Sequence, residues 1–148
     1  MERGEYEIIE ASLGKRFANY IIDHFCIAIF ISMIFDFLEA QGYRLVEDIY
    51  SLRVRLIAVL LYALIYFVIE SLTGGKSFGK WVTKTRAVEF DGGVPDTETF
   101  IIRSFSRIIP FEPLSFLFLS RGWHDRFSKT MVMDEKLTIY HTKNDEEE

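Results

Sequence analysis

The sequence has little cysteine and histidine, and this scarcity excludes several kinds of site. One cysteine, Cys26, stands among 148 residues, so a disulfide within the chain is excluded. Neither Cys26 nor the three histidines show the spacing of a metal site. No set of Ser, His and Asp, or of Cys and His, has a spacing that predicts nucleophilic catalysis. We therefore predict no enzyme, no metal site and no bound cofactor.

A concentrated basic region is also missing. The chain carries 17 Lys and Arg against 22 Asp and Glu, a net charge of −5. Much of the acidic excess lies in Asn144–Glu148 (NDEEE), and we expect an acidic, disordered tail over residues 134–148. The basic residues are spread along the chain instead of massed on one face, so nucleic-acid binding is not predicted.

No segment completes a nucleotide-binding loop or a secretory signal. Gly74–Lys80 (GGKSFGK) matches the start of the phosphate-binding pattern G-x-x-x-x-G-K. Trp81 follows where Ser or Thr would hold Mg²⁺, and an apolar helix precedes where a strand is required, so no nucleotide is expected. Helix termination explains the glycines better, and contact with lipid headgroups explains the lysines. The head of the chain is mixed in charge, and no small-residue cleavage site follows, so no secretory signal is expected.

Two apolar runs predict membrane helices, although each is shorter than a full span. Leu56–Ile69 has fourteen residues without a charge and Phe25–Phe35 has eleven. A span needs about 20 residues, but basic side chains at the ends can snorkel and aromatic residues flank both runs. We expect spans over about 17–38 and 54–72. The alternative is a pair of buried core helices in a small soluble domain.

Lys and Arg are distributed unevenly about these spans. Nine Lys and Arg residues either precede the first span or follow the second span, up to and including Arg107. The connection between the spans carries three. The positive-inside rule then places both termini in the cytoplasm, with residues 1–14 as a cytoplasmic segment. We expect a multi-pass protein of the cell membrane.

The second half of the chain predicts less regular structure at the cytoplasmic surface. Trp81–Phe90 is rich in Val and Thr and precedes a Gly-rich turn, which favours a short strand or β-hairpin. Residues 96–107 fit an interfacial helix with Arg103 and Arg107 toward anionic headgroups. Residues 108–119 are apolar but short and interrupted by proline, which favours a re-entrant segment, while a third full span stays open.

The predicted fold class is therefore an all-α membrane protein. It consists of a two-helix transmembrane hairpin, a cytoplasmic-side β-hairpin and an interfacial or re-entrant third helical segment.

Each predicted span carries a polar stripe. Arg16 and Asp23 lie seven residues apart, about 10 Å along one helix face, and Tyr66 and Glu70 share a face of the second span. A carboxylate in the hydrocarbon zone costs about 2.5–3.5 kcal/mol, so the stripes should face each other rather than lipid. We expect Arg16 to pair with Asp23 or Glu70, in a functional cluster or a purely structural one. His24 lies about 100° around the helix from Asp23, so direct pairing is awkward.

The order of these motifs resembles the RDD family of small membrane proteins, named for one arginine and two aspartates. LGKRFANYIIDHF supplies Arg16 and Asp23 at the first membrane helix, and ESLTGGKSFGK resembles the family's Gly-Lys loop, which ends here at Lys80. WHDRFSKTMVM resembles the closing segment and makes Asp125 the second aspartate. The likeness covers nearly the whole chain, and we place the RDD-like membrane domain at residues 15–133.

The resemblance implies transport of ions or small solutes, whereas the residues alone leave two classes of function. In an oligomeric transporter or cation/proton exchanger, Asp23 would bind a proton or cation, and Arg16 or another cation would tune its pKa. Glu70 and Asp125 would then line the cytoplasmic mouth. Two spans cannot enclose a pathway, so this class requires a homo-oligomer or another membrane protein in the lipid bilayer. In a non-transporting accessory or scaffold module, the same cluster is structural. Secondary site candidates are His24, Tyr66 and Lys80.

Overall fold

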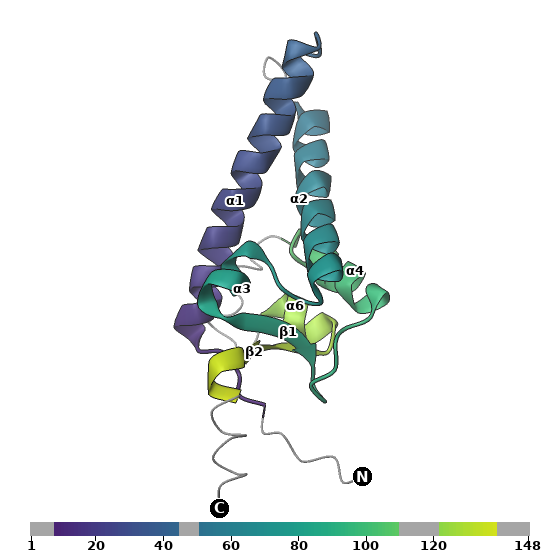
Figure 1. The fold of residues 1–148 in the computed structure, drawn as a ribbon. Coiled ribbons are helices and arrows are strands. Elements are labelled where there is room, and N and C mark those ends of the chain that lie inside the picture. Colours follow the sequence, from purple (N-terminus) through teal and green to yellow (C-terminus); the bar gives the residue numbers. More distant parts are fainter. Residues whose placement is uncertain (1–7, 45–50, 110–121, 139–148) are drawn as a thin grey trace, which may run out of the picture.

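Two long helices form a hairpin that stands on a small mixed domain (Figure 1). The computed structural model describes residues 8–44, 51–109 and 122–138. Helices α1 (Leu13–Ala40) and α2 (Leu52–Thr73) each begin after a serine whose side chain accepts a hydrogen bond from a first-turn N–H. These N-caps satisfy a backbone donor that the helix itself leaves unpaired.

The apolar side chains of α1 and α2 are mostly exposed. Both helices are long and apolar enough to cross a membrane. Within the apolar 18-residue stretch of each helix, however, only 11% of α1 and 17% of α2 is buried. Core helices of a soluble domain would have these side chains covered, and an exposed apolar surface of this extent would be unusual in water. The hairpin therefore has the character of membrane helices, and the alternative of two buried core helices is wrong.

The elements that follow α2 gather at one end of the hairpin (Figure 1). Helix α3 (Phe78–Thr83) packs against α1, α4 (Thr97–Ser106) packs against α2, and α6 (Trp123–Phe127) packs against α4. The predicted helix at residues 96–107 is confirmed as α4, with Asp96 as its N-cap. This arrangement brings residues from three short helices to the open end of the hairpin.

A two-stranded antiparallel sheet completes the small domain. β1 (Thr85–Glu89) pairs with β2 (Thr130–Asp134), with the first residue of one opposite the last of the other. The strand predicted within Trp81–Phe90 is confirmed, but the local hairpin is wrong. Pro95 follows the turn after β1 and lacks the N–H that a paired strand needs, whereas β2 supplies buried residues and a complete ladder.

Two glycines allow the small domain to approach the hairpin closely. A Cβ at Gly79 would lie 2.5 Å from the carbonyl oxygen of Asn19, so α3 can touch α1 only because this residue has no side chain. Gly75 has a φ of 96°, and its carbonyl accepts a hydrogen bond from the N–H of Ala87 at 2.9 Å. These contacts fix α3 and β1 against the two long helices.

Two predicted segments fall largely outside the described residues. Of residues 108–119, only Ile108 and Ile109 are described, so the re-entrant segment and the third span stay predictions. The disordered tail predicted over residues 134–148 is wrong for its first part. Asp134 ends β2 and accepts a hydrogen bond from Lys15, and residues 135–138 form a helical turn.

Candidate functional site

A buried carboxylate near the end of α2 binds three cations. Glu70 is 0% exposed. Its Oε1 accepts from Lys80 Nζ at 2.7 Å and from Arg107 Nη2 at 3.2 Å, while Oε2 accepts from Arg103 Nε at 3.2 Å. An isolated buried charge is costly, so each member of this cluster depends on the others. The cluster joins α2 to α3 and to α4.

Arg103 extends this network to α6 and β2. Its side chain is 0% exposed and donates from Nη1 to Asp125 Oδ1 at 2.7 Å and to the hydroxyl of Thr130. Asp125 also lies 3.3 Å from His124 Nε2, and Thr130 shares a hydrogen bond of 2.7 Å with Ser128. We call Glu70, Lys80, Arg103, Arg107 and Asp125 the ion-pair network.

Asp23 lies apart from this network, in contact with α3. Its carboxylate is 2% exposed and accepts from the hydroxyl of Ser77 at 2.6 Å and from the N–H of Gly79 at 2.7 Å. Both donors are neutral, and they belong to the N-cap and the first turn of α3. Among the described residues, no basic side chain forms an ion pair with Asp23, in contrast to Glu70 and Asp125.

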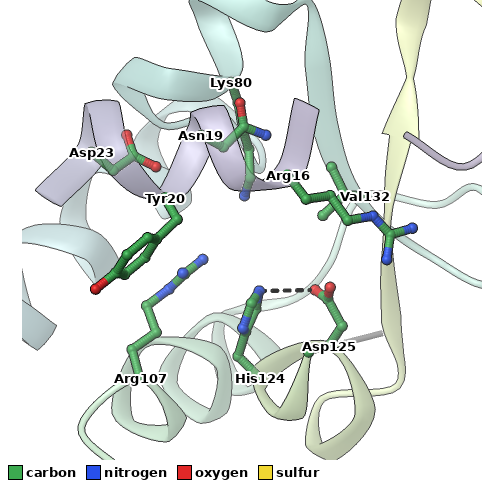
Figure 2. A pocket seen from close by; sticks show the side chains of 10 residues that line it. Arg16, Asn19, Tyr20, Asp23, Lys80, Arg107, His124, Asp125 and Val132 are labelled. Carbon is green, nitrogen blue, oxygen red and sulfur yellow. Dashed lines mark ion pairs between the residues drawn. The ribbon is translucent and has the colours of Figure 1, made fainter. Parts of the chain in front are cut away.

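A cavity of about 30 Å³ separates Asp23 from part of the ion-pair network (Figure 2). Lys80, Arg107 and His124 point toward this space, and the dashed line marks the contact between His124 and Asp125. A space of this size holds about one or two water molecules or a small ion. Carboxylates and cations line this space, although most of its exposed wall is carbon. The lining residues are Arg16, Asn19, Tyr20, Asp23, Lys80, Arg107, Gly122, His124, Asp125 and Val132.

The predicted pairing of Arg16 with Asp23 or Glu70 is wrong. The Arg16 guanidinium donates to Glu10 at 2.8 Å and to the carbonyl of Ala11 at 2.9 Å. Because α1 begins at Leu13, Arg16 lies in its first turn and reaches back to the residues before the helix. The four side chains of the stripes are buried, but Asp23 and Glu70 bond to the small domain and Arg16 bonds to the residues before α1, so these bonds do not join one span to the other.

Three cations that were expected at lipid headgroups are buried instead. Lys80 and Arg103 are almost fully covered, and the side chain of Arg107 is nearly so. The physical reason is Glu70, whose charge at the end of a membrane helix requires neutralisation from the segments that pack around it. The sequence suggested no partner for Glu70 other than Arg16.

The spacing of the arginines in α4 was the signal that could have located them. Arg103 and Arg107 stand four residues apart, so they share one helix face, whereas Ile101 and Phe105 lie on another. In the structure the apolar residues are exposed and the arginines point inward. Sequence reasoning also missed Ser77, which is the N-cap of α3 and a partner of Asp23.

Burial and neighbouring charges act in opposite directions on the network. Burial alone would raise the pKa of Asp125, but His124 and Arg103 attract its charged form and lower the pKa to about 2. Burial lowers the pKa of Lys80, and the attraction of Glu70 opposes this change without overcoming it. Asp125 is therefore ionised throughout the physiological range of pH.

Aromatic rings line the space between α1 and α2 next to the network. The centroids of Tyr20 and His24 lie 5.8 Å apart, those of His24 and Tyr62 lie 6.1 Å apart, and those of Tyr62 and Tyr66 lie 5.1 Å apart. The Arg107 guanidinium lies 4.2 Å from the centroid of the Tyr66 ring, within the range of a cation–π contact. The candidates His24 and Tyr66 thus belong to one row of rings beside a groove of about 570 Å³.

A family model described as the RDD family matches residues 10–129. The chain belongs to the RDD family. The match extends from the residues before α1 through α6, so it includes Arg16, Asp23, Glu70 and Asp125. Neither the curated proteins nor the solved structures gave a match. RDD membership and two exposed apolar helices together indicate a membrane protein.

Proposed function

We propose that this RDD-family protein is an oligomeric transporter or cation/proton exchanger in which Asp23 binds the proton or cation. The observation that carries the proposal is a buried carboxylate that, among the described residues, is held by neutral donors, beside a small cavity lined by charged side chains. Such a group can exchange a proton for a small cation without breaking an ion pair. Glu70 and Asp125 are each bound to Arg103, so protonation of either would remove an ion pair.

The groove between α1 and α2 supports a pathway that another subunit completes. Its wall includes the polar side chains of Tyr20, His24 and Tyr62, which would be costly against lipid. Two helices cannot enclose a path, so a second copy or another membrane protein would supply the remaining wall. We place the small domain and both termini in the cytoplasm. The segments at this end of the hairpin carry more Lys and Arg than the connection between α1 and α2 at the other end.

Proton movement in proteoliposomes tests this function. We expect the native protein to exchange protons for Na⁺ or K⁺, and Asp23→Asn to abolish this exchange in protein that inserts and assembles normally. Asp91→Asn is the matched control because Asp91 lies in the exposed turn after β1, and it should leave exchange unchanged. Exchange that persists in Asp23→Asn would refute the role of this carboxylate.

The closed arrangement around Glu70 favours a second candidate function. A carboxylate with 0% exposure and three cationic partners is what a purely structural cluster requires. In this case the protein is a non-transporting accessory or scaffold module, and the network holds the small domain on the hairpin. A native protein that moves no protons with any cation, together with an Asp23→Asn variant that loses stability, would favour this candidate.

A further inference from the structure

Helix α3 presents one apolar face away from the protein. Phe78, Trp81 and Val82 are exposed on this face, whereas Gly79 and Lys80 on the other face are buried against α1 and the network. Trp81 is 51% exposed. Its ring lies edge-to-face with the ring of Phe78, and the two ring centroids are 6.3 Å apart. A short helix with this division of residues exposes more apolar surface than water favours.

Helix α4, on the α2 side of the hairpin, also has an exposed apolar face and a buried face (Figure 1). Ile101 and Phe105 are exposed, whereas Phe100 and Arg103 are buried. The two short helices therefore flank the same end of the hairpin, each with an apolar face outward.

The exposed face of α3 is continuous with the apolar surface of the long helices. Phe78 lines a groove of about 540 Å³ together with Ile27 and Ile69, and this groove has almost no polar wall. If lipid covers α1 and α2, the same lipid layer reaches Phe78. The neighbouring Trp81 and Val82 would then lie at its edge.

The length of the hairpin places α3 and α4 at the boundary of the bilayer. Asp23 contacts α3, and the part of α1 from Asp23 to Ala40 is about 26 Å long at the helical rise of about 1.5 Å per residue. Glu70 contacts α4, and the part of α2 before it is about 27 Å long by the same measure. Both lengths approach the hydrocarbon thickness of about 30 Å.

We propose that α3 and α4 lie in the membrane–water interface, with their exposed apolar side chains among the lipid acyl carbons nearest the headgroups. The partner of this surface is the phospholipid of one leaflet. Trp81 is the anchor on α3, because an indole ring prefers this depth of a bilayer. The proposal depends on α1 and α2 crossing a bilayer and is independent of transport, so a failed transport assay would leave it intact.

Fluorescence quenching of Trp81 tests the proposal on the full chain in phospholipid vesicles. The sequence has two tryptophans, so Trp123→Phe leaves Trp81 as the only one. We expect strong loss of emission with lipids that carry a quencher near the headgroup, a smaller loss with a quencher near the chain end, and little loss with aqueous iodide. If Trp123→Phe does not fold, the difference between native protein and Trp81→Phe gives the same signal.

A tryptophan on the far side of the sheet gives the matched control. Leu137 is 47% exposed, close to the value for Trp81, and lies in the helical turn that Figure 1 shows on the side of the sheet away from the hairpin. Leu137→Trp in a chain with both native tryptophans replaced by Phe should respond to iodide and not to lipid quenchers. Quenching of Trp81 by iodide would overturn the proposal, since α3 would then face water. Protection of Trp81 from all quenchers would also overturn it, because a protein partner would then cover α3.

Discussion

Replacement of Glu70 by glutamine should destabilise the protein strongly. Glu70→Gln keeps the size of the side chain but removes the charge that binds Lys80, Arg103 and Arg107 in a site without exposure to solvent. The amide also has one acceptor oxygen in place of two, so its NH₂ group would face at least one cationic donor. Removal of one partner from a buried ion pair costs about 3–5 kcal/mol. We expect a loss of about 4 kcal/mol in the free energy of unfolding, a large part of the roughly 5–15 kcal/mol of a typical domain.

Denaturant unfolding in detergent micelles, followed by tryptophan fluorescence, measures this loss. Trp123 begins α6, which also carries Asp125, so its emission reports on the network. Glu135→Gln is the matched control, because Glu135 also binds two cations, Lys76 and Arg86, but its side chain is 19% exposed. Solvent screening should limit the loss in this control to about 1 kcal/mol or less.

A double variant separates the lost charge from a general loss of packing. Glu70→Gln combined with Lys80→Met removes one of the cations that the first change leaves unpaired, so it should recover part of the stability. A loss below about 1 kcal/mol in Glu70→Gln would refute the reasoning, since the pair would then behave like an exposed one. Equal stability of the single and double variants would show that the unpaired charge of Lys80 accounts for little of the loss in Glu70→Gln.

Two further predictions concern the contact of α3 with α1 and the response to acid. Gly79→Ala places a Cβ against the carbonyl of Asn19 and should cost about 1–3 kcal/mol, whereas Gly14→Ala, with open space around its Cβ, should be neutral or slightly stabilising in the same unfolding assay. The pKa of Asp125 is about 2 in the folded protein against an ordinary 3.8, so its ionised form contributes about 2 kcal/mol above pH 4, and this is lost as the pH falls toward 2. Unfolding curves between pH 2 and pH 6 should show this slope, and Asp125→Asn, which removes one of the two carboxylates bound to Arg103, should flatten it.

The long helices could be predicted from the sequence, whereas the sheet could not. Each apolar run, together with its basic and aromatic flanks, favours a membrane helix through residues close by in the sequence. β1 depends on a partner that comes after α4 and α6, and nothing in Thr85–Glu89 specifies that partner. The turn after β1 suggested a hairpin, and only Pro95 argued against it.

In the candidate site, too, the acidic residues could be recognised from the sequence nearby, whereas their partners depend on contacts between segments that are distant in the sequence. Asp23 and Glu70 could be recognised because an acidic residue in an apolar helix is costly wherever it lies. Their partners could not, because Ser77, Arg103 and Arg107 reach them only through the packing of α3 and α4. Arg16 is the Lys or Arg nearest to Asp23 in the sequence, and proximity along the chain gave Asp23 the wrong partner.

Helix α3 connects Asp23, the proposed proton or cation site, to Glu70 in the ion-pair network. Its N-terminal end donates to Asp23 through Ser77 and Gly79, and the next residue, Lys80, binds Glu70. A helix of six residues held by hydrogen bonds at both contacts moves nearly as one body. We therefore expect a change of charge at Asp23 that weakens its bonds to α3 to act on the Lys80–Glu70 pair, and through Glu70 on α4. Because the close contact at Gly79 leaves no room for α3 to tilt toward α1, such a movement would have to be directed away from α1.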